Sequence, residues 1–343
     1  MPPRPDTRPA KNGGTYNVLL TGFGVCDHVH SLMLVEADLR FAQPFGQHKE
    51  NPSWLAVRPL QNTLITLDPH PDPIVPDPTA SPAADGPAPA ILNEEPKRLP
   101  PAEIRISTLE IPVEYETIMK IVPGLHARPP VLPEQVQGNS LFPAPPERGY
   151  DFIFHIGVAG RGPLRMEKLA HKTGYHMKDA SGNYAPTSNT KKSEEVNGAA
   201  SAAGVVVAPE GQPRLPSTEI PPETAPLDNF TLRVHRGYGH GYERFTEELL
   251  TDIDVTRLVQ DMKLAGIEHV YSSMDAGHYL CDFIYYGSLA EAQRNKKPFE
   301  KANRTRVLFM HCPPVDQPCS TEDVTNAIKQ IIVWVCEDGG SDS

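Results

Sequence analysis

The residue types that together catalyse acyl transfer occur in three separate segments of this chain. Cys281 follows a glycine-containing turn and opens a predicted helix, and His311 ends a predicted strand. Glu167 follows another predicted strand, over residues 151–157. A thiol, an imidazole and a carboxylate can serve as the nucleophile, the general base and the group that orients the base. Hydrolysis through a cysteine nucleophile is therefore one chemistry that the sequence allows.

The five cysteines of the chain do not have equal claims to this role. Cysteine is among the most buried residue types, so a single cysteine belongs to a core more often than it acts as a nucleophile. Cys281 stands apart because the N-terminus of a helix lowers the pKa of a thiol and favours the reactive thiolate. Cys312 is a rival because it directly follows His311. A hydrolase that uses Cys312 is therefore an alternative.

The histidine and the carboxylate also have ordinary structural interpretations. His311 fits a buried core histidine at the end of a strand as well as it fits a general base. Glu167 could pair with a surface lysine, and Asp275 or Asp282 could orient the histidine instead. The residues alone therefore leave these assignments open.

Alternating strands and helices must position these side chains. Strands are predicted over residues 17–21, 103–111, 151–157, 268–273 and 306–311, and helices from Asn51–Trp54 onward and over 113–121, 255–264, 279–291 and 320–335. This alternation predicts an α/β fold, a three-layer α/β/α sandwich around a twisted, mostly parallel sheet with proline-rich loop insertions. Ligands of such sheets bind beyond the carboxyl ends of the strands, so we expect the candidate residues to converge at one sheet edge.

Proline marks interruptions of this core. The chain has 343 residues and 38 prolines, about twice the usual share, and proline-rich segments cannot supply a second domain. Apolar residues make up 39% of the chain, enough for one core. We therefore predict a single α/β domain after a disordered N-terminus. The N-terminus is residues 1–14, the domain is 15–338, and the interruptions, interpreted as loops or disorder, are 67–102, 123–149 and 179–228.

Composition also excludes several classes of protein. The formal net charge of −11 argues against a nucleic-acid partner that needs a basic surface. No apolar run reaches the roughly 18 residues of a membrane span, and no apolar stretch follows the N-terminal basic residues as in a secretory signal. An odd number of scattered cysteines favours a reduced, cytoplasmic protein over a disulfide framework. The CxxC, HExxH and GxGxxG motifs are absent from the sequence.

The segments that hold the candidate residues resemble pyroglutamyl peptidase I (pyrrolidone-carboxyl peptidase), a family of cytosolic cysteine peptidases. The matching stretches are VLLTGFG (18–24), PFG (44–46), NPSW (51–54), IPVEY (111–115), HIGVAG (155–160), MEK (166–168) with His171 and Gly174-Tyr175, DAGHYLCDF (275–283) with Tyr285-Tyr286, and HCPP (311–314). They occur in order and span the core elements from end to end, and the proline-rich segments lie outside them. The chain thus resembles a fungal-like member with long insertions.

The resemblance implies a catalytic triad and an activity. The nucleophile falls on Cys281, the general base on His311 and the acidic partner on Glu167, in the family's order Glu–Cys–His. The implied activity is that of a thiol protease, which removes an N-terminal pyroglutamyl (5-oxoprolyl) residue from peptides with no metal or cofactor. Peptides with N-terminal pyroglutamate are thus the implied partners, and a homo-oligomer is left open.

The resemblance also implies a substrate pocket. The pyroglutamyl group has no charged α-amine, so an apolar pocket can hold its flat lactam ring. Phe23 and Phe45 are implied to form much of that pocket, and Tyr279 and Leu280 to line it. Arg161 is a further candidate, because an arginine occurs nearby in bacterial members. The segment around Arg161 is slightly shorter here, and solvation at the surface is an equal alternative for this side chain.

One segment departs from the family's substrate loop. The 19 residues 25–43 separate Gly24 from Pro44 and therefore part Phe23 from Phe45. Val25-Cys26 can be encoded as a 5′ splice signal, Ala37-Asp38 as a branch site and Gln43 as a 3′ splice end, so we hypothesise a retained intron. A genuine insertion is the alternative. It would impair the pocket, and the chain would then be a catalytically impaired homologue that binds peptides or regulates. A transcript that keeps these codons would refute the intron hypothesis.

Overall fold

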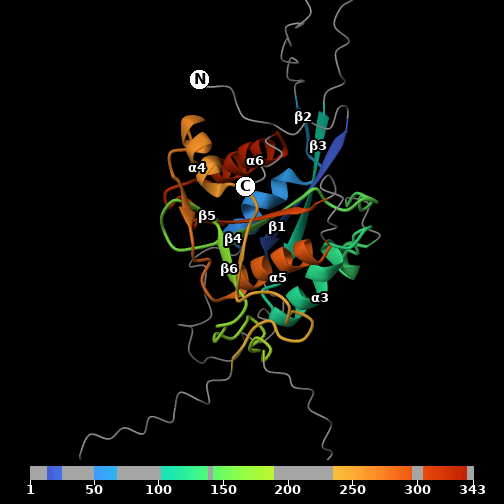
Figure 1. The fold of residues 1–343 in the computed structure, drawn as a ribbon. Coiled ribbons are helices and arrows are strands. Elements are labelled where there is room, and N and C mark those ends of the chain that lie inside the picture. The colour runs from blue at the N-terminus through green and yellow to red at the C-terminus, as the bar shows by residue number, and fades with distance from the viewer. Residues whose placement is uncertain are drawn as a thin grey trace, which may run out of the picture.

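The predicted strands lie in one seven-stranded sheet (Figure 1). The computed structural model describes residues 14–24, 50–67, 102–137, 142–188, 235–295 and 304–337. Along the sheet the strands are β2 (Leu64–Leu67), β3 (Ala102–Ile111), β1 (Thr15–Phe23), β4 (Phe152–Val158), β9 (Arg306–Cys312), β5 (Leu164–Glu167) and β8 (Val270–Ser273). Strands β6 (Leu169–His171) and β7 (Glu248–Leu250) form a separate antiparallel pair.

Most neighbouring strands of this sheet are parallel, as predicted. β3, β1, β4 and β9 run in one direction, and β5 is parallel to β8. β5 is antiparallel to β9, and β2 is antiparallel to β3. We predicted that the candidate residues converge because parallel strands end at the same edge of a sheet, and this reason is wrong for two segments. Glu167 and the turn after β8 reach the site from strands that run against β4 and β9, rather than from a shared carboxyl edge.

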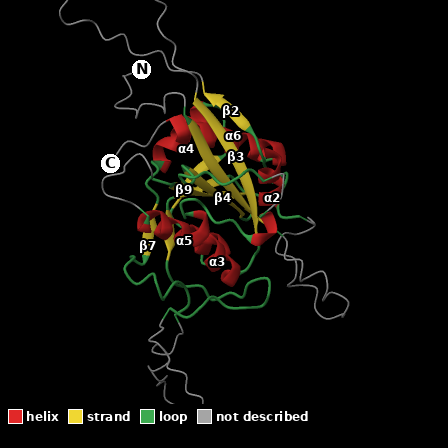
Figure 2. Cartoon of the chain, turned by 90° about the vertical axis from the view of Figure 1, so that its right-hand side faces the viewer, coloured by secondary structure: helices red, strands yellow, loops and turns green. Residues whose placement is uncertain are grey.

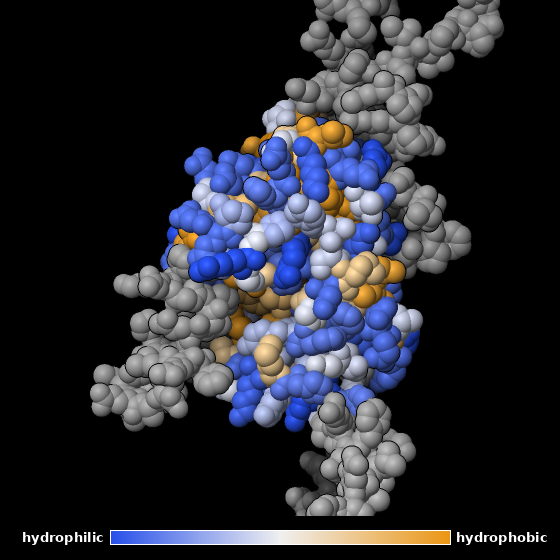
Figure 3. All heavy atoms as spheres, turned by 90° about the vertical axis from the view of Figure 1, so that its left-hand side faces the viewer, coloured by the Kyte–Doolittle hydropathy of each residue, from blue (hydrophilic) through white to orange (hydrophobic). Residues whose placement is uncertain are grey.

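Helices cover both faces of the sheet, so the predicted three-layer α/β/α sandwich is confirmed (Figure 2). Helices α2 (Pro52–Val57), α4 (Val255–Leu264) and α6 (Thr321–Glu337) pack on one face. Helices α3 (Tyr115–Leu125) and α5 (Leu280–Arg294) pack on the other, and short 3-10 helices occur at Arg58–Leu60 and Glu134–Val136. The surface on the side of α4 and β5 is mainly hydrophilic, with its apolar residues in separate patches (Figure 3).

The period of two along the strands decides which side chains meet which helices. On β9, Leu308 and Met310 lie in the core under α2, α4 and α6, whereas Phe309 lies in the core under α3 and α5. The same alternation turns Glu167 and His311 toward the α5 face. Two side chains of the candidate site therefore share one face of the sheet.

Two predicted helix starts are confirmed by their capping bonds. The Oδ1 atom of Asn51 accepts a hydrogen bond from Ser53 N at 3.0 Å, with Pro52 at the first helical position of α2. At α6, Ser320 N donates to an Asp323 carboxylate oxygen at 2.9 Å, and Asp323 N donates to Ser320 Oγ at 3.1 Å. The second pattern is a reciprocal capping box, which satisfies backbone donors that a helix start leaves unpaired.

Some boundaries differ from the predictions. α3 runs past Pro123 to Leu125, so the predicted loop 123–149 begins inside a helix. β2, β5, β6 and β7 were not predicted; each has only three or four residues, and in β5 two of the four are charged. The described cysteines, Cys281, Cys312, Cys319 and Cys336, are free thiols.

Several interpretations concern residues that the structure does not describe. The segment 25–43, Phe45 and most of 1–14, 67–102 and 179–228 lie outside the described residues. Their interpretation as disorder, loops or a retained intron stays a prediction. Within the described ranges, no helix combines the length and the apolar character of a membrane span.

Candidate active site

His311 and Glu167 form a buried pair on the α5 face of the sheet. His311 Nδ1 lies 2.7 Å from Glu167 Oε1, and the side chains are 5% and 0% exposed. Glu167 pairs in register with Phe309 on the neighbouring strand, two residues before His311, so the two side chains are diagonal neighbours. An Nδ1–H bond to the carboxylate leaves the Nε2 atom of His311 free to accept a proton.

A guanidinium stands beside this pair. Arg165 pairs in register with His311, and its Nε atom lies 4.0 Å from Glu167 Oε1. Glu167 Oε2 and Arg165 Nε are buried and have no hydrogen-bond partner among the described residues. Arg165 therefore adds positive charge beside Oε1, the same carboxylate oxygen that contacts His311, without a hydrogen bond to it. The sequence analysis missed Arg165, although it precedes Glu167 by the two residues that separate neighbours on one face of a strand.

The thiol of Cys281 packs directly on the sheet. Cys281 lies in the first turn of α5, and a Cβ atom on Gly157 would lie 2.8 Å from Cys281 Sγ. Gly157 pairs in register with His311 across β4 and β9. The sulfur thus contacts β4 at Gly157, which lies beside His311 on the neighbouring strand β9. Only a residue without a side chain leaves room for this approach.

The predicted thiolate is contradicted by the surroundings of Cys281. Burial raises the pKa of the Cys281 thiol to about 12, and the Asp282 carboxylate, the Cys312 thiol and Glu167 act in the same direction. Arg165 opposes this rise. Desolvation thus outweighs the effect of the helix N-terminus, and the thiol is protonated near neutral pH. A nucleophile at this position needs a base to take its proton.

The rival residues lie elsewhere. Cys312 belongs to the core under α2, α4 and α6, on the face of the sheet away from Glu167. Asp282 accepts hydrogen bonds from His171 N and Tyr175 Oη, and Asp275 accepts one from Gly277 N at 2.8 Å. Among the described residues, Glu167 is the carboxylate that contacts the His311 ring.

The apolar candidates border one hydrophobic cluster. Phe23 and Leu280 are buried members of the cluster between the sheet and helices α3 and α5, and Tyr279 packs against it. Phe23 N donates to Ser53 Oγ at 3.1 Å, which ties the end of β1 to the start of α2. Tyr279 Oη donates to Lys178 O at 3.2 Å. Three of the predicted pocket residues thus belong to or border the cluster against which Cys281 packs, and the fourth, Phe45, lies outside the described residues.

Arg161 lies apart from this cluster. Its side chain is exposed, and its Nε atom donates to Gln317 Oε1 at 2.6 Å. Gln317 belongs to the loop that follows β9. This bond agrees with the alternative in which Arg161 is a surface side chain. A contact between Arg161 and the substrate stays a prediction.

Comparisons with known proteins agree with the family resemblance. No family model matches the chain. The chain is 22% identical over 293 residues to Pyroglutamyl-peptidase 1 of Mus musculus, covering 84% of each protein. The Homo sapiens protein of the same name matches with the same identity and coverage. The chain is thus similar, over most of its length, to proteins named Pyroglutamyl-peptidase 1.

Solved structures of the family are also similar to this chain. Pyroglutamyl peptidase I from Bacillus amyloliquefaciens is 18% identical with a TM-score of 0.48, and the match covers 95% of this chain and 99% of that one. The pyrrolidone carboxyl peptidase of Fervidobacterium islandicum is 17% identical with a TM-score of 0.46, covering 93% and 98% of the two chains.

Proposed function

We propose that this chain is a cysteine-type pyroglutamyl peptidase, which removes N-terminal pyroglutamyl residues from peptides through Cys281, His311 and Glu167. The observation that carries the proposal is the seat of the Cys281 thiol on Gly157, beside the buried His311–Glu167 pair. The similarity to the Pyroglutamyl-peptidase 1 proteins of Mus musculus and Homo sapiens supports the same activity.

The first half of the reaction transfers the acyl group to sulfur. His311 Nε2 takes the proton of the Cys281 thiol, and the sulfur attacks the carbonyl carbon of the pyroglutamyl residue. The carbonyl oxygen becomes an oxyanion as the C–S bond forms. His311 then gives its proton to the leaving amine, the C–N bond breaks, and a thioester remains on Cys281.

The second half restores the enzyme. Water gives a proton to His311 and attacks the thioester carbonyl, so that pyroglutamate leaves and the sulfur regains its proton from His311. Glu167 accepts the Nδ1–H bond throughout, which holds the tautomer of the ring and stabilises the imidazolium.

The start of α5 is suited to stabilise the oxyanion. Tyr279 occupies the N-cap position of α5 and makes no side-chain capping hydrogen bond. Backbone N–H groups of the first turn are unpaired by the helix itself and point toward its N-terminal end. Because the Tyr279 side chain does not cap this helix start, these donors are proposed to stabilise a developing negative charge beside Cys281.

The binding pocket for the lactam is proposed to be apolar. Phe23, Tyr279 and Leu280 border the cluster next to the thiol, and Phe45 is proposed as the fourth wall. The pyroglutamyl ring is uncharged, so its burial against aromatic side chains needs no counter-ion.

Residues 25–43 favour a second candidate function. They separate Phe23 from Phe45 in the chain, and a genuine insertion there supports a catalytically impaired homologue that binds peptides or regulates. The single domain over 15–338, the cytoplasmic location and a homo-oligomer remain further proposals.

One assay tests these proposals together. Purified full-length protein and a variant without residues 25–43 are given a fluorogenic pyroglutamyl amide. Turnover by either form is expected, and turnover by the shortened form alone would favour the impaired homologue for the full chain. No turnover from either form would refute the peptidase. Turnover that survives Cys281→Ala would refute the site.

A further inference from the structure

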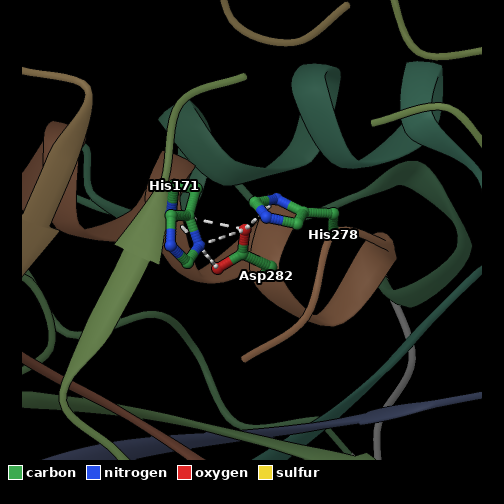
Figure 4. Close-up of side chains that lie close together, drawn as sticks. All are labelled: His171, His278 and Asp282. Carbon is green, nitrogen blue, oxygen red and sulfur yellow. Dashed lines mark hydrogen bonds and ion pairs between the residues drawn. The ribbon is translucent and has the colours of Figure 1, made fainter. Parts of the chain in front are cut away.

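Two histidines and an aspartate meet beside the start of α5, outside the catalytic group (Figure 4). His171 ends β6, His278 lies in the turn before α5, and Asp282 lies in the first turn of α5. One possible ligand atom from each side chain lies within 4.8 Å of the other two. Imidazole nitrogens and a carboxylate oxygen are the donors of many zinc sites.

The spacing of these atoms is close to that around a bound ion. His171 Nδ1 lies 3.2 Å and His278 Nδ1 lies 3.9 Å from Asp282 Oδ2. In a tetrahedral zinc site, the bonds to nitrogen and oxygen are about 2.0–2.1 Å long, which places neighbouring ligand atoms about 3.4 Å apart. The two separations to Asp282 Oδ2 are therefore within about 0.5 Å of the tetrahedral spacing, and all three atoms lie within 4.8 Å of one another.

Hydrogen bonding explains the position of His171 but not that of His278. The Asp282 carboxylate accepts a bond from His171 N at 3.1 Å and lies within reach of the ring. The 3.9 Å separation from His278 Nδ1 is too long for a hydrogen bond. The His278 ring packs against the His171 ring, with centroids 4.5 Å apart, and a shared ion would draw the Nδ1 atoms of both rings toward one oxygen.

The surrounding structure holds the three side chains in place. Asp282 is fully buried, and Tyr175 Oη donates to its Oδ2 atom at 2.9 Å. The His278 ring packs on Gly174, where a Cβ atom would lie 3.0 Å from His278 Nδ1 and where φ is +107°. The His278 ring has room at this position because Gly174 has no side chain. The ring is therefore already fixed, and binding of a metal ion would cost little conformational entropy.

We propose that His171, His278 and Asp282 bind a divalent transition metal ion, best matched by Zn²⁺, with a fourth position open to solvent. The site is separate from the nucleophile, because Cys281 Sγ is seated on Gly157. A bound ion would tie the end of β6 to the turn that carries Tyr279. The proposed hydrolysis contains no step that uses this ion.

The test measures Zn²⁺ binding directly and does not depend on peptidase activity. Full-length Cys281→Ser, which removes the reactive thiol as a ligand, competes for Zn²⁺ with a chromophoric chelator. We expect one tight equivalent, weakened at least about tenfold by an added His278→Ala. The matched control is His240→Ala, because that side chain is 92% exposed and lies outside the cluster; it should leave the affinity unchanged.

Folding is checked on the same samples. Circular dichroism and thermal unfolding in metal-free buffer should be the same with and without His278→Ala, since this side chain is half exposed. His171→Ala serves as a second variant and should also weaken binding. An absence of tight binding, or an affinity that His278→Ala leaves unchanged, would overturn the proposal. Either result could occur in an active peptidase, so the two proposals fail separately.

Discussion

Replacing Gly157 with alanine tests the seat of the thiol most directly. The new Cβ atom would lie 2.8 Å from Cys281 Sγ and 2.7 Å from Phe309 Cζ. Ordinary contact begins at about 3.5–4.0 Å, so the sulfur must retreat by roughly 0.7–1.2 Å. A displacement of about 1 Å at a reacting atom costs about 100-fold in rate, or about 2.7 kcal/mol of transition-state stabilisation.

The assay compares kcat/KM of Gly157→Ala and the unchanged protein on a fluorogenic pyroglutamyl amide. Gly160→Ala is the matched control, because a Cβ atom there meets nothing within 4 Å, and it should keep its activity. Crowding also destabilises the fold, by about 1–3 kcal/mol, so thermal unfolding must show that Gly157→Ala is folded at the assay temperature.

The result that refutes the reasoning is also clear. If folded Gly157→Ala keeps its kcat/KM within about twofold of the unchanged protein, the sulfur does not react from its seat on β4. If Gly160→Ala loses as much activity as Gly157→Ala, the loss reflects a general effect of substitutions in residues 157–160 and not a displacement of the Cys281 thiol.

Three further predictions concern the base, the thiol and a helix start. Glu167→Gln should keep the shape of the buried pair but lower kcat by about 10³–10⁴-fold, because an amide does not stabilise the imidazolium of His311; kcat within tenfold of the unchanged protein would contradict this role. Alkylation of Cys281, followed by mass spectrometry, should speed up about tenfold per pH unit from pH 7 to 9, because a raised pKa leaves little thiolate; a rate that levels off in this range would indicate a stable thiolate. Ser320→Ala removes the capping box at Asp323 and should cost about 1 kcal/mol of unfolding free energy in urea with kcat unchanged; unchanged stability would show that the cap contributes nothing.

The sequence pattern was sufficient for the main strands but not for β5. The alternation in β9 could be recognised because the strand is seven residues long and apolar. β5 carries Arg165 and Glu167 among four residues, and such a segment is indistinguishable from a polar loop. Glu167 is buried because β9 and β8 flank β5 on both sides. This is a long-range effect that a local pattern does not contain.

The same limit applies to the state of the candidate nucleophile. A cysteine that opens a helix predicts a lowered thiol pKa, and that inference follows from neighbours in the chain. Burial raises the pKa of the Cys281 thiol, and Glu167, which approaches from β5, acts in the same direction through its charge. Likewise, the spacing of His278 and Asp282 is visible in the sequence, whereas the approach of His171 requires the fold.

The contacts at residues 188 and 235 bear on how the protein could be redesigned. Ser188 N donates to His235 O at 2.9 Å, and Thr187 bridges to Arg236 in antiparallel fashion. The chain therefore leaves the described structure after residue 188 and re-enters it beside the point of exit. Because the two ends already meet, a short turn could replace residues 189–234 with a small change in loop-closure entropy. The same junction is a natural place to graft a foreign domain or an affinity tag onto the enzyme.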